Sequence, residues 1–368
     1  MTGVQTCALP ILQAAVDSGN VEVIRLLLDR GANVNAEGGE HGNALQTAVY
    51  LDNVEAMRLL LDKGADVNAQ AGYYGTALQV AAIHDEVKAM RLLLEWGADA
   101  NAQSGHYGKA LQAAAYCGNT ETIGLLLDNG ADVNAQGGHY GNALQAASYC
   151  GNAEAIRLLL DKGANVNVQG GEYGNALRAA AYNGQDKVMR HLLEKGADIN
   201  AQSGEHGNAL QAAAFMNQAK AIRLLLDKGA DIDAQGGFHG SALQAAAYNG
   251  NIEAMRLLLD KGADVNAQGG CYGNALQAAA FWGQFSQAEA MRLLLDRGAD
   301  VNAQGGKYGS ALQAAAYRGQ LNAIRLLLDK GADINAQGGE FGSALRAATD
   351  AGQVEAMQLL QNNPSLVT

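Results

Sequence analysis

The stretch GNALQAA begins at Gly141 and returns letter for letter at Gly207 and Gly273. Near-copies begin at Gly75, Gly108, Gly174, Gly240 and Gly309. The leucine of this stretch recurs every 33 residues from Leu12 to Leu345, with a single step of 36 where WGQFSQAEAM carries three extra residues. A fixed period of this length indicates a repeat architecture built from one small module.

The first half of a unit predicts a short helix. Asn142 suits an N-cap, and Gln145 is placed three residues later to complete a variant of the capping box. Leu144, Ala147 and Ser148 then form a narrow apolar face, and Gly151 ends the helix.

The second half predicts another helix, capped by Asn152 and stopped by Gly163. Its buried stripe is expected to contain Ala155, Ile156, Leu159 and Leu160. Both helices are shorter than the roughly 12–15 residues that an isolated helix needs. Each unit must therefore bury its helices against the next unit, and this constraint explains why the seven letters return.

The 33-residue helix–turn–helix unit with the LLLDKGADVNAQ exit resembles the ankyrin repeat from Leu12 to Leu360. The resemblance implies an all-α solenoid with short hairpin-like loops along its concave side. The entry departs from the family's Thr-Pro-Leu-His, since Asn or Ser, Ala, Leu and Gln or Arg stand there. The loops also differ, because an aromatic residue or His (Tyr74, His206, Tyr308) occupies a position where a turn glycine is common.

The period places the unit boundaries. We expect a truncated first unit at 12–39, a C-terminal capping repeat and tail at 340–368, and between them nine repeats at 40–72, 73–105, 106–138, 139–171, 172–204, 205–237, 238–270, 271–306 and 307–339. Residues 1–11, MTGVQTCALPI, resemble a translated sequencing adapter and are expected not to be native. Leu12 would then begin without a capping unit, so we expect an exposed apolar edge and fraying of the first unit.

Composition narrows the function. The 368 residues carry a formal charge of −12 and show no basic face, which argues against nucleic-acid binding. Apolar runs such as Leu59–Leu61 are too short to cross a bilayer. Apart from Cys7, the cysteines form no disulfide framework, which suits a reducing, cytoplasmic location with the nucleus also open. We expect a monomer.

Comparison of the repeats within the chain separates positions that stacking constrains from positions that vary. The residue two before each turn glycine varies in charge and size, and so does the last residue of the first helix. In ankyrin-like stacks these positions line the concave groove where partners usually bind. The predicted partner-binding residues are Tyr73, His106, His139, Glu172, Glu205, Phe238, Cys271, Lys307, Tyr116, Tyr149, Tyr182, Tyr248, Trp282 and Arg318.

Four of these belong to an aromatic series near the end of the first helix, which Ile83 interrupts. Two interpretations are open: a binding stripe, or rings that pack on the neighbouring unit. Packing is favoured, because a nearly constant residue discriminates no partner by itself. Trp282, beside the irregular loop, is the preferred hot-spot candidate.

Chemical sites are not indicated. His106 and His139 invite a metal, but helices pack roughly 8–10 Å apart, whereas zinc needs several ligands at about 2.0–2.3 Å. No nucleophile–base constellation or GxxxxGK[ST] phosphate loop is present. We expect no catalysis and no cofactor.

We therefore predict non-catalytic recognition of a protein, with a basic or mixed-charge partner favoured. An alternative stays open, because the YGNALQAA style resembles C-terminal arrays of fungal NACHT-type NTPases. The array would then be the sensing or autoinhibitory tail of a larger protein. A phosphate-binding loop in an intact upstream transcript would favour this alternative, whereas further repeats or a start codon would favour the first.

Overall fold

The computed structural model describes residues 5–38, 41–203, 207–282 and 286–362. Contacts divide the chain into two compact units, residues 1–176 and 177–368. Both units are built from pairs of short helices, which confirms the predicted all-α repeat. Within the described part, no helix combines the length and apolar character needed to cross a membrane.

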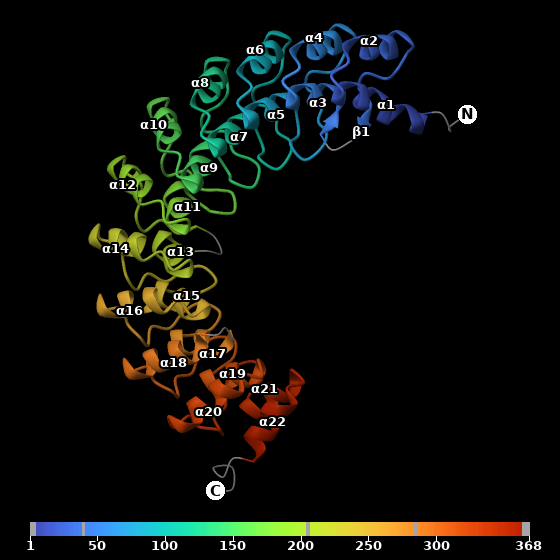
Figure 1. Ribbon diagram of the computed structural model, residues 1–368. Helices are drawn as coiled ribbons and strands as arrows, with labels where there is room; N and C mark the ends of the chain where they lie inside the picture. The colour runs from blue at the N-terminus through green and yellow to red at the C-terminus, as the bar shows by residue number, and fades with distance from the viewer. Residues whose placement is uncertain (1–4, 39–40, 204–206, 283–285, 363–368) are drawn as a thin grey trace. The chain divides into compact units, whose positions relative to one another are not determined.

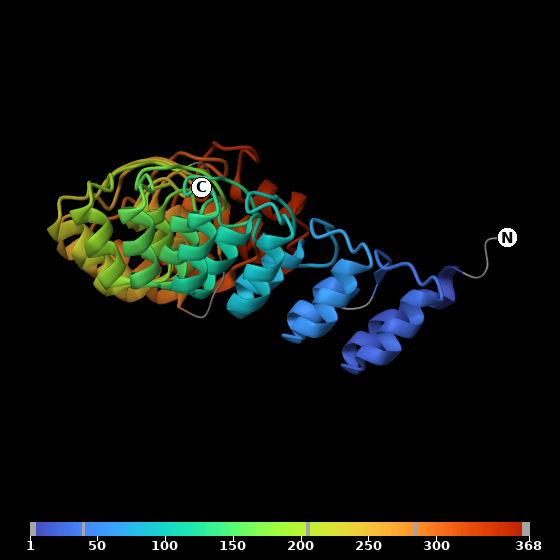
Figure 2. The same ribbon diagram turned by 90° about the horizontal axis from the view of Figure 1, so that it is seen from above.

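In unit 1 the first helices of successive repeats pack side by side in one row. The second helices form another row alongside it, drawn above the first helices in Figure 1. The first helices are α1 (Gln5–Asp17), α3 (Ala44–Tyr50), α5 (Ala77–His84), α7 (Ala110–Cys117) and α9 (Ala143–Cys150). The second helices are α2 (Val21–Asp29), α4 (Val54–Asp62), α6 (Val87–Glu95), α8 (Thr120–Asp128) and α10 (Ala153–Asp161). The loops of this unit lie along one side of the helices (Figure 2, blue to green).

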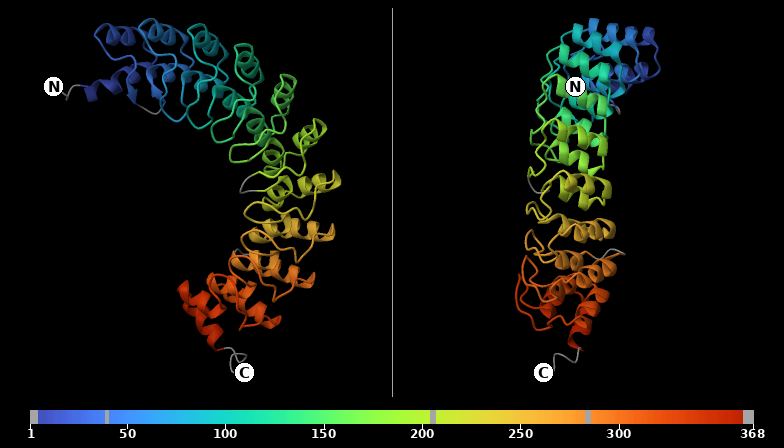
Figure 3. Two further views of the ribbon diagram at one scale, coloured as in Figure 1. Left: turned by 180° about the vertical axis from the view of Figure 1, so that it is seen from behind. Right: turned by 90° about the vertical axis from the view of Figure 1, so that its left-hand side faces the viewer.

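Unit 2 repeats this arrangement, and its loops also lie on one side of its helices (Figure 3, right, yellow to red). Its first helices are α11 (Ala176–Tyr182), which starts at the unit boundary, α13 (Ala209–Phe215), α15 (Ala242–Asn249), α17 (Ala275–Phe281), α19 (Ala311–Tyr317) and α21 (Ala344–Asp350). Its second helices are α12 (Asp186–Glu194), α14 (Ala219–Asp227), α16 (Ile252–Asp260), α18 (Gln287–Asp296), α20 (Leu321–Asp329) and α22 (Val354–Gln361).

The first helix of each inner repeat is more buried than its sequence predicts. In α9 every residue from Ala143 to Ser148 is buried, whereas a single narrow face was expected. The helix is enclosed because it packs on the first helix of the preceding repeat, α7, and on its own second helix, α10. On α10 the expected stripe is found at Ala155, Ile156 and Leu159, while Leu160 is only half-buried.

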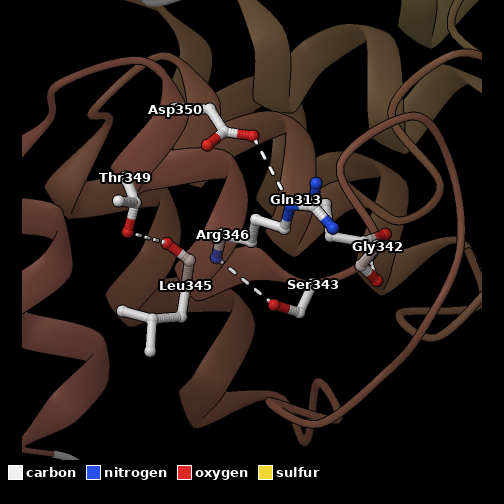
Figure 4. Close-up of polar contacts among 7 residues, drawn as sticks. All are labelled: Gln313, Gly342, Ser343, Leu345, Arg346, Thr349 and Asp350. Atoms are coloured by element: carbon white, nitrogen blue, oxygen red, sulfur yellow. Dashed lines mark hydrogen bonds and ion pairs between the residues drawn. The ribbon is translucent and has the colours of Figure 1, made fainter.

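The buried glutamine of the first helix joins adjacent repeats. The Asn142 N–H donates to Gln145 Oε1 over 2.8 Å, and the Gln145 N–H donates to Asn142 Oδ1 over 2.9 Å, which confirms the capping box. The Gln145 amide also donates to the carbonyl of Gly174, in the next loop, over 2.8 Å. In unit 2 Gln313 likewise donates to Gly342 (Figure 4). One side chain thus caps its own helix and fixes the following loop.

Asparagine side chains make two further inter-repeat contacts. In the exit loops, Asn68 donates to Gly97 O over 3.2 Å and accepts from Asp99 N over 2.8 Å. At the start of α10, Asn152 was expected to cap its own helix, but this prediction was wrong. Its side chain donates instead to Ala115 O and Tyr116 O of the preceding repeat, at 3.0 and 2.7 Å. Those carbonyls end a helix and have no intrahelical partner.

The turn glycine before the first helix is required for close packing of loops. Gly108 has φ +89°, and a Cβ there would lie 2.6 Å from the carbonyl carbon of Gly137 in the next loop. Eight of the described loops close as narrow antiparallel hairpins through an isolated bridge, such as that between Gly137 and Gly141. The first hairpin has two short strands, β1 (Glu37–Gly38) and β2 (Gly42–Asn43), paired Glu37 to Asn43 and Gly38 to Gly42.

Helix α1 begins at Gln5, so the helical segment includes residues that were expected not to be native. The predicted apolar edge is present in this first repeat. Leu26 is 54% exposed, whereas Leu59 at the same position of the next repeat is 6% exposed. Val23 and Ile11 are exposed as well.

In α21 Asp350 occupies the position that an aromatic residue holds in most inner repeats. Its carboxylate lies 3.7 Å from Arg346 Nε (Figure 4). Thr349 Oγ1 donates to the Leu345 carbonyl one turn earlier. Residues 283–285 of the irregular repeat lie outside the described residues. Around them, Ser286 donates to Gly250 O, and the buried Gln287 donates to Ala279 O.

Candidate partner-binding surface

The variable loop residues form one row at the loop tips of each unit, here called the tip row. The tip row of unit 1 is Tyr73, His106, His139 and Glu172, and that of unit 2 is Phe238, Cys271, Lys307 and Glu340. Along each row the N–H of one tip donates to the carbonyl of the preceding tip, at 3.0–3.1 Å in unit 1 and 2.8–2.9 Å in unit 2. The backbone therefore holds variable side chains at a fixed spacing. Glu205, also predicted here, lies outside the described residues.

In unit 1 the side chains of the tip row contact one another. The rings of Tyr73 and His106 stack with centroids 5.1 Å apart, and those of His106 and His139 stack at 5.0 Å. His139 Nδ1 lies 2.9 Å from Glu172 Oε2. Burial and then the neighbouring His139 lower the pKa of His106, while Glu172 acts in the opposite direction. Tyr73, at the start of the row, is 58% exposed.

The two imidazoles are closer than the helix spacing suggested, because they lie on adjoining loop tips rather than on helices. The metal site still lacks ligands. Among the residues that the structure describes, no three His, Cys, Asp or Glu side chains are grouped to hold a metal ion.

In unit 2 the tip row has the same plan with other side chains. Phe238 is 48% exposed at its start. At its other end Lys307 Nζ lies 3.3 Å from Glu340 Oε2, and this hydrogen-bonded pair raises the pKa of Lys307. Cys271 lies between them, half-buried and with a free thiol. Both rows thus begin with an exposed ring and end in a nitrogen base paired with a glutamate.

The predicted aromatic residues of the first helices pack against a second aromatic series that the sequence analysis did not assign. We call it the loop-ring column; it consists of His41, Tyr74, Tyr107, Tyr140, Tyr173, His239, Tyr272, Tyr308 and Phe341. Each of these residues directly precedes the turn glycine of its repeat. The ring or imidazole that recurs at this position in the sequence is the signal that could have identified the series.

Contacts of Tyr140 show how the two series fit together. Its ring lies 4.9 Å from Tyr116 and 5.5 Å from Tyr149, and it stacks on Tyr173 at 5.9 Å. Burial, then the hydrogen bond with Tyr116, raises the pKa of the Tyr140 hydroxyl. Tyr272 makes the same kind of contact with Tyr248 at 5.1 Å. Tyr116, Tyr149 and Tyr248 are therefore half-buried residues that pack on the loop-ring column.

Trp282 and Arg318 form a separate stack at the ends of first helices in unit 2. Trp282 stacks on Tyr248 at 5.2 Å, and the Arg318 guanidinium lies 5.3 Å above the Trp282 ring and 5.0 Å above Phe281. Both contacts cover ring faces of Trp282, which is half-buried. Tyr73 and Phe238 consequently offer more accessible aromatic surface than the residue preferred from sequence. Tyr182, at the end of α11, is half-buried and its carbonyl accepts from Gln218.

Cys117 and Cys150 are free thiols on neighbouring first helices, as expected. Burial, and then the neighbouring Cys117, raises the pKa of Cys150 to about 11. The thiol is therefore protonated and weakly nucleophilic near neutral pH.

The sequence was compared with known families and structures. A family model described as "Ankyrin repeats (3 copies)" matches residues 3–71, 70–137, 111–203, 144–236 and 210–305, and one described as "Ankyrin repeats (many copies)" matches 286–328 and 312–361. The crystal structure of the human ASB11 ankyrin repeat domain is similar at 26% sequence identity and a TM-score of 0.51, over 61% of this chain and 98% of that chain. The search of curated proteins gave no match. With family matches along nearly its whole length, the chain belongs to the ankyrin-repeat family.

Proposed function

We propose that this chain is a non-catalytic recognition module that binds a protein partner through its tip rows and the adjoining ends of the first helices. Ankyrin repeats indicate a protein–protein interaction domain. The observation that carries the proposal is the backbone hydrogen bonding from tip to tip, which fixes positions whose side chains differ in charge, size and polarity. A rigid frame reduces the ordering cost of binding, and variable side chains select the partner.

The accessible rings supply the apolar part of this surface. Tyr73 is 58% exposed and Phe238 48%, while four rings of the loop-ring column are buried: Tyr140, Tyr173, Tyr272 and Tyr308. Aromatic side chains give large contact area with few rotatable bonds, which is why they dominate hot spots. The −12 charge favours a partner with basic or mixed charge.

The test is to replace Tyr73, Phe238 and Trp282 with alanine together and to quantify proteins captured from extracts of the source cells. We expect the triple variant to lose the specific partners while circular dichroism stays unchanged. Trp96→Ala is the matched control, because Trp96 is 44% exposed but lies at the end of a second helix. Capture that survives in the triple variant and falls in Trp96→Ala would place recognition on the second-helix side instead.

A further inference from the structure

The chain contains a longer period of five repeats. EHGNALQ at 40–46 returns unchanged at 205–211, which is 165 residues later, or five steps of 33. Arginine replaces the glutamine of the first helix at two positions only, Arg178 and Arg346. These are 168 residues apart, which is five steps plus the three-residue insertion.

The tip rows follow the same period. Tyr73 corresponds to Phe238, His106 to Cys271, His139 to Lys307, and Glu172 to Glu340. Each row therefore carries an accessible ring at one end, then a half-buried residue, then a nitrogen base paired with a glutamate. The His139–Glu172 distance is 2.9 Å and the Lys307–Glu340 distance is 3.3 Å, so the pairing is kept although the base has changed.

In both pairs the carboxylate is the more accessible member. The Glu172 side chain is 53% exposed against 30% for His139, and Glu340 is 56% exposed against 47% for Lys307. A carboxylate has several lone pairs, so a glutamate that is already paired can accept more than one N–H. The row offers a basic ligand one apolar and one anionic contact.

We propose that the two tip rows are equivalent docking sites for two copies of one extended basic peptide segment. In each copy an apolar side chain covers Tyr73 or Phe238, and a lysine or arginine reaches Glu172 or Glu340. The proposal rests on the function proposed above and adds the number of sites and the chemistry of the segment.

The spacing along the tip row sets how far apart the apolar and basic side chains of the peptide segment must be. Ring centroids of successive tips lie 5.0–5.1 Å apart in unit 1. Three steps from Tyr73 to Glu172 thus span about 15 Å, which an extended peptide rising about 3.3 Å per residue covers in four or five residues. The apolar and basic side chains of the ligand are accordingly expected four or five positions apart.

Two equivalent sites on one chain suit a partner that presents the segment twice, either as a dimer or as an internal repeat. The second contact would then be intramolecular, which raises overall affinity without a new interaction at either site.

The experiment uses a short peptide selected from a random display library on the immobilised full chain, followed by calorimetry with the full chain in solution. We expect selected peptides to pair an apolar and a basic residue at the stated spacing, and two peptides to bind per chain. Tyr73→Ala and Phe238→Ala should each leave one site, and the double variant should lower affinity at least about tenfold at both. Trp96→Ala should retain both sites.

Glu172→Gln and Glu340→Gln provide a second pair of variants with minimal effect on folding, and each should weaken one site. One peptide per chain for the wild type, two sites surviving in either single variant, or selection of acidic peptides would overturn the proposal of two basic-peptide sites. If instead no selected peptide responds to any tip-row variant, the recognition function proposed for this surface fails as well.

Discussion

At the scale of single residues, the glutamine found in most first helices shows how one polar side chain holds two repeats together. Gln145 is 1% exposed, accepts from Asn142 N and donates to Gly174 O. Its capping role follows from the spacing to Asn142. The bond to the next loop was not predicted, because no local pattern relates residues 29 positions apart.

Gln145→Ala should lower the free energy of unfolding by about 2–4 kcal/mol, because a buried N–H and a buried carbonyl lose their partner. Urea unfolding followed by circular dichroism measures the change. Gln136→Ala, at an exposed loop glutamine, is the control and should have little effect. Equal losses for the two variants would mean that the buried bonds contribute nothing specific.

Asp52 adopts a left-handed conformation, φ +49°, at a turn position where most repeats have glycine. At the same position of the sixth full repeat stands Asn217, with φ +55°. Asp52 also faces Glu86. Burial, then the charge and hydrogen bond of Asp52, raises the pKa of Glu86. A carboxyl group whose pKa is raised by folding contributes stability at low pH, and this contribution is lost as pH rises through the raised pKa.

Asp52→Asn should therefore stabilise the protein at pH 7 by about 0.5–1 kcal/mol, since asparagine tolerates the left-handed region and removes the repulsion. The gain should shrink at pH 4, where protonated Glu86 no longer repels Asp52. Thermal unfolding at the two pH values checks this. A gain of equal size at both would show that the backbone conformation alone is responsible.

At the scale of elements, the helix positions and the capping boxes were predictable because caps, stops and apolar spacing are local. The burial of α9 from Ala143 to Ser148 depends on contacts with the neighbouring repeat. The same holds for Asn152, whose side chain donates to the preceding repeat and not to its own helix. The loop-ring column was missed for a similar reason. A ring before a glycine has no role that the local sequence shows. The burial of Tyr140 comes from the rings of Tyr116, Tyr149 and Tyr173, which include neighbouring repeats.

The first repeat should open more readily than the inner repeats. Leu26 and Val23 of α2 are exposed, whereas at the same positions of α8 Leu125 is half-buried and Thr122 is fully buried. Backbone amides at residues 21–29 should exchange with deuterium faster than those at 120–128. Exchange in α2 as slow as in α8 would contradict the expected fraying.

At the scale of the whole molecule, the sequence predicted the stacking of modules and the loop tips as the variable surface. The tip residues could be chosen because copies within one chain show where variation is tolerated. Ring accessibility could not be ranked, since Trp282 is covered by Tyr248 and Arg318 while Tyr73 and Phe238 are open.

Hydrogen–deuterium exchange of the full chain with and without a selected peptide tests the account most directly. Binding at the tip rows should slow exchange at residues 104–108 and 137–141 in unit 1 and at 269–273 and 305–309 in unit 2. Exchange along α4, α6, α14 and α16 should stay unchanged. Slowing confined to those second helices, with the loop tips unaffected, would contradict the central claim that the tip rows bind the partner.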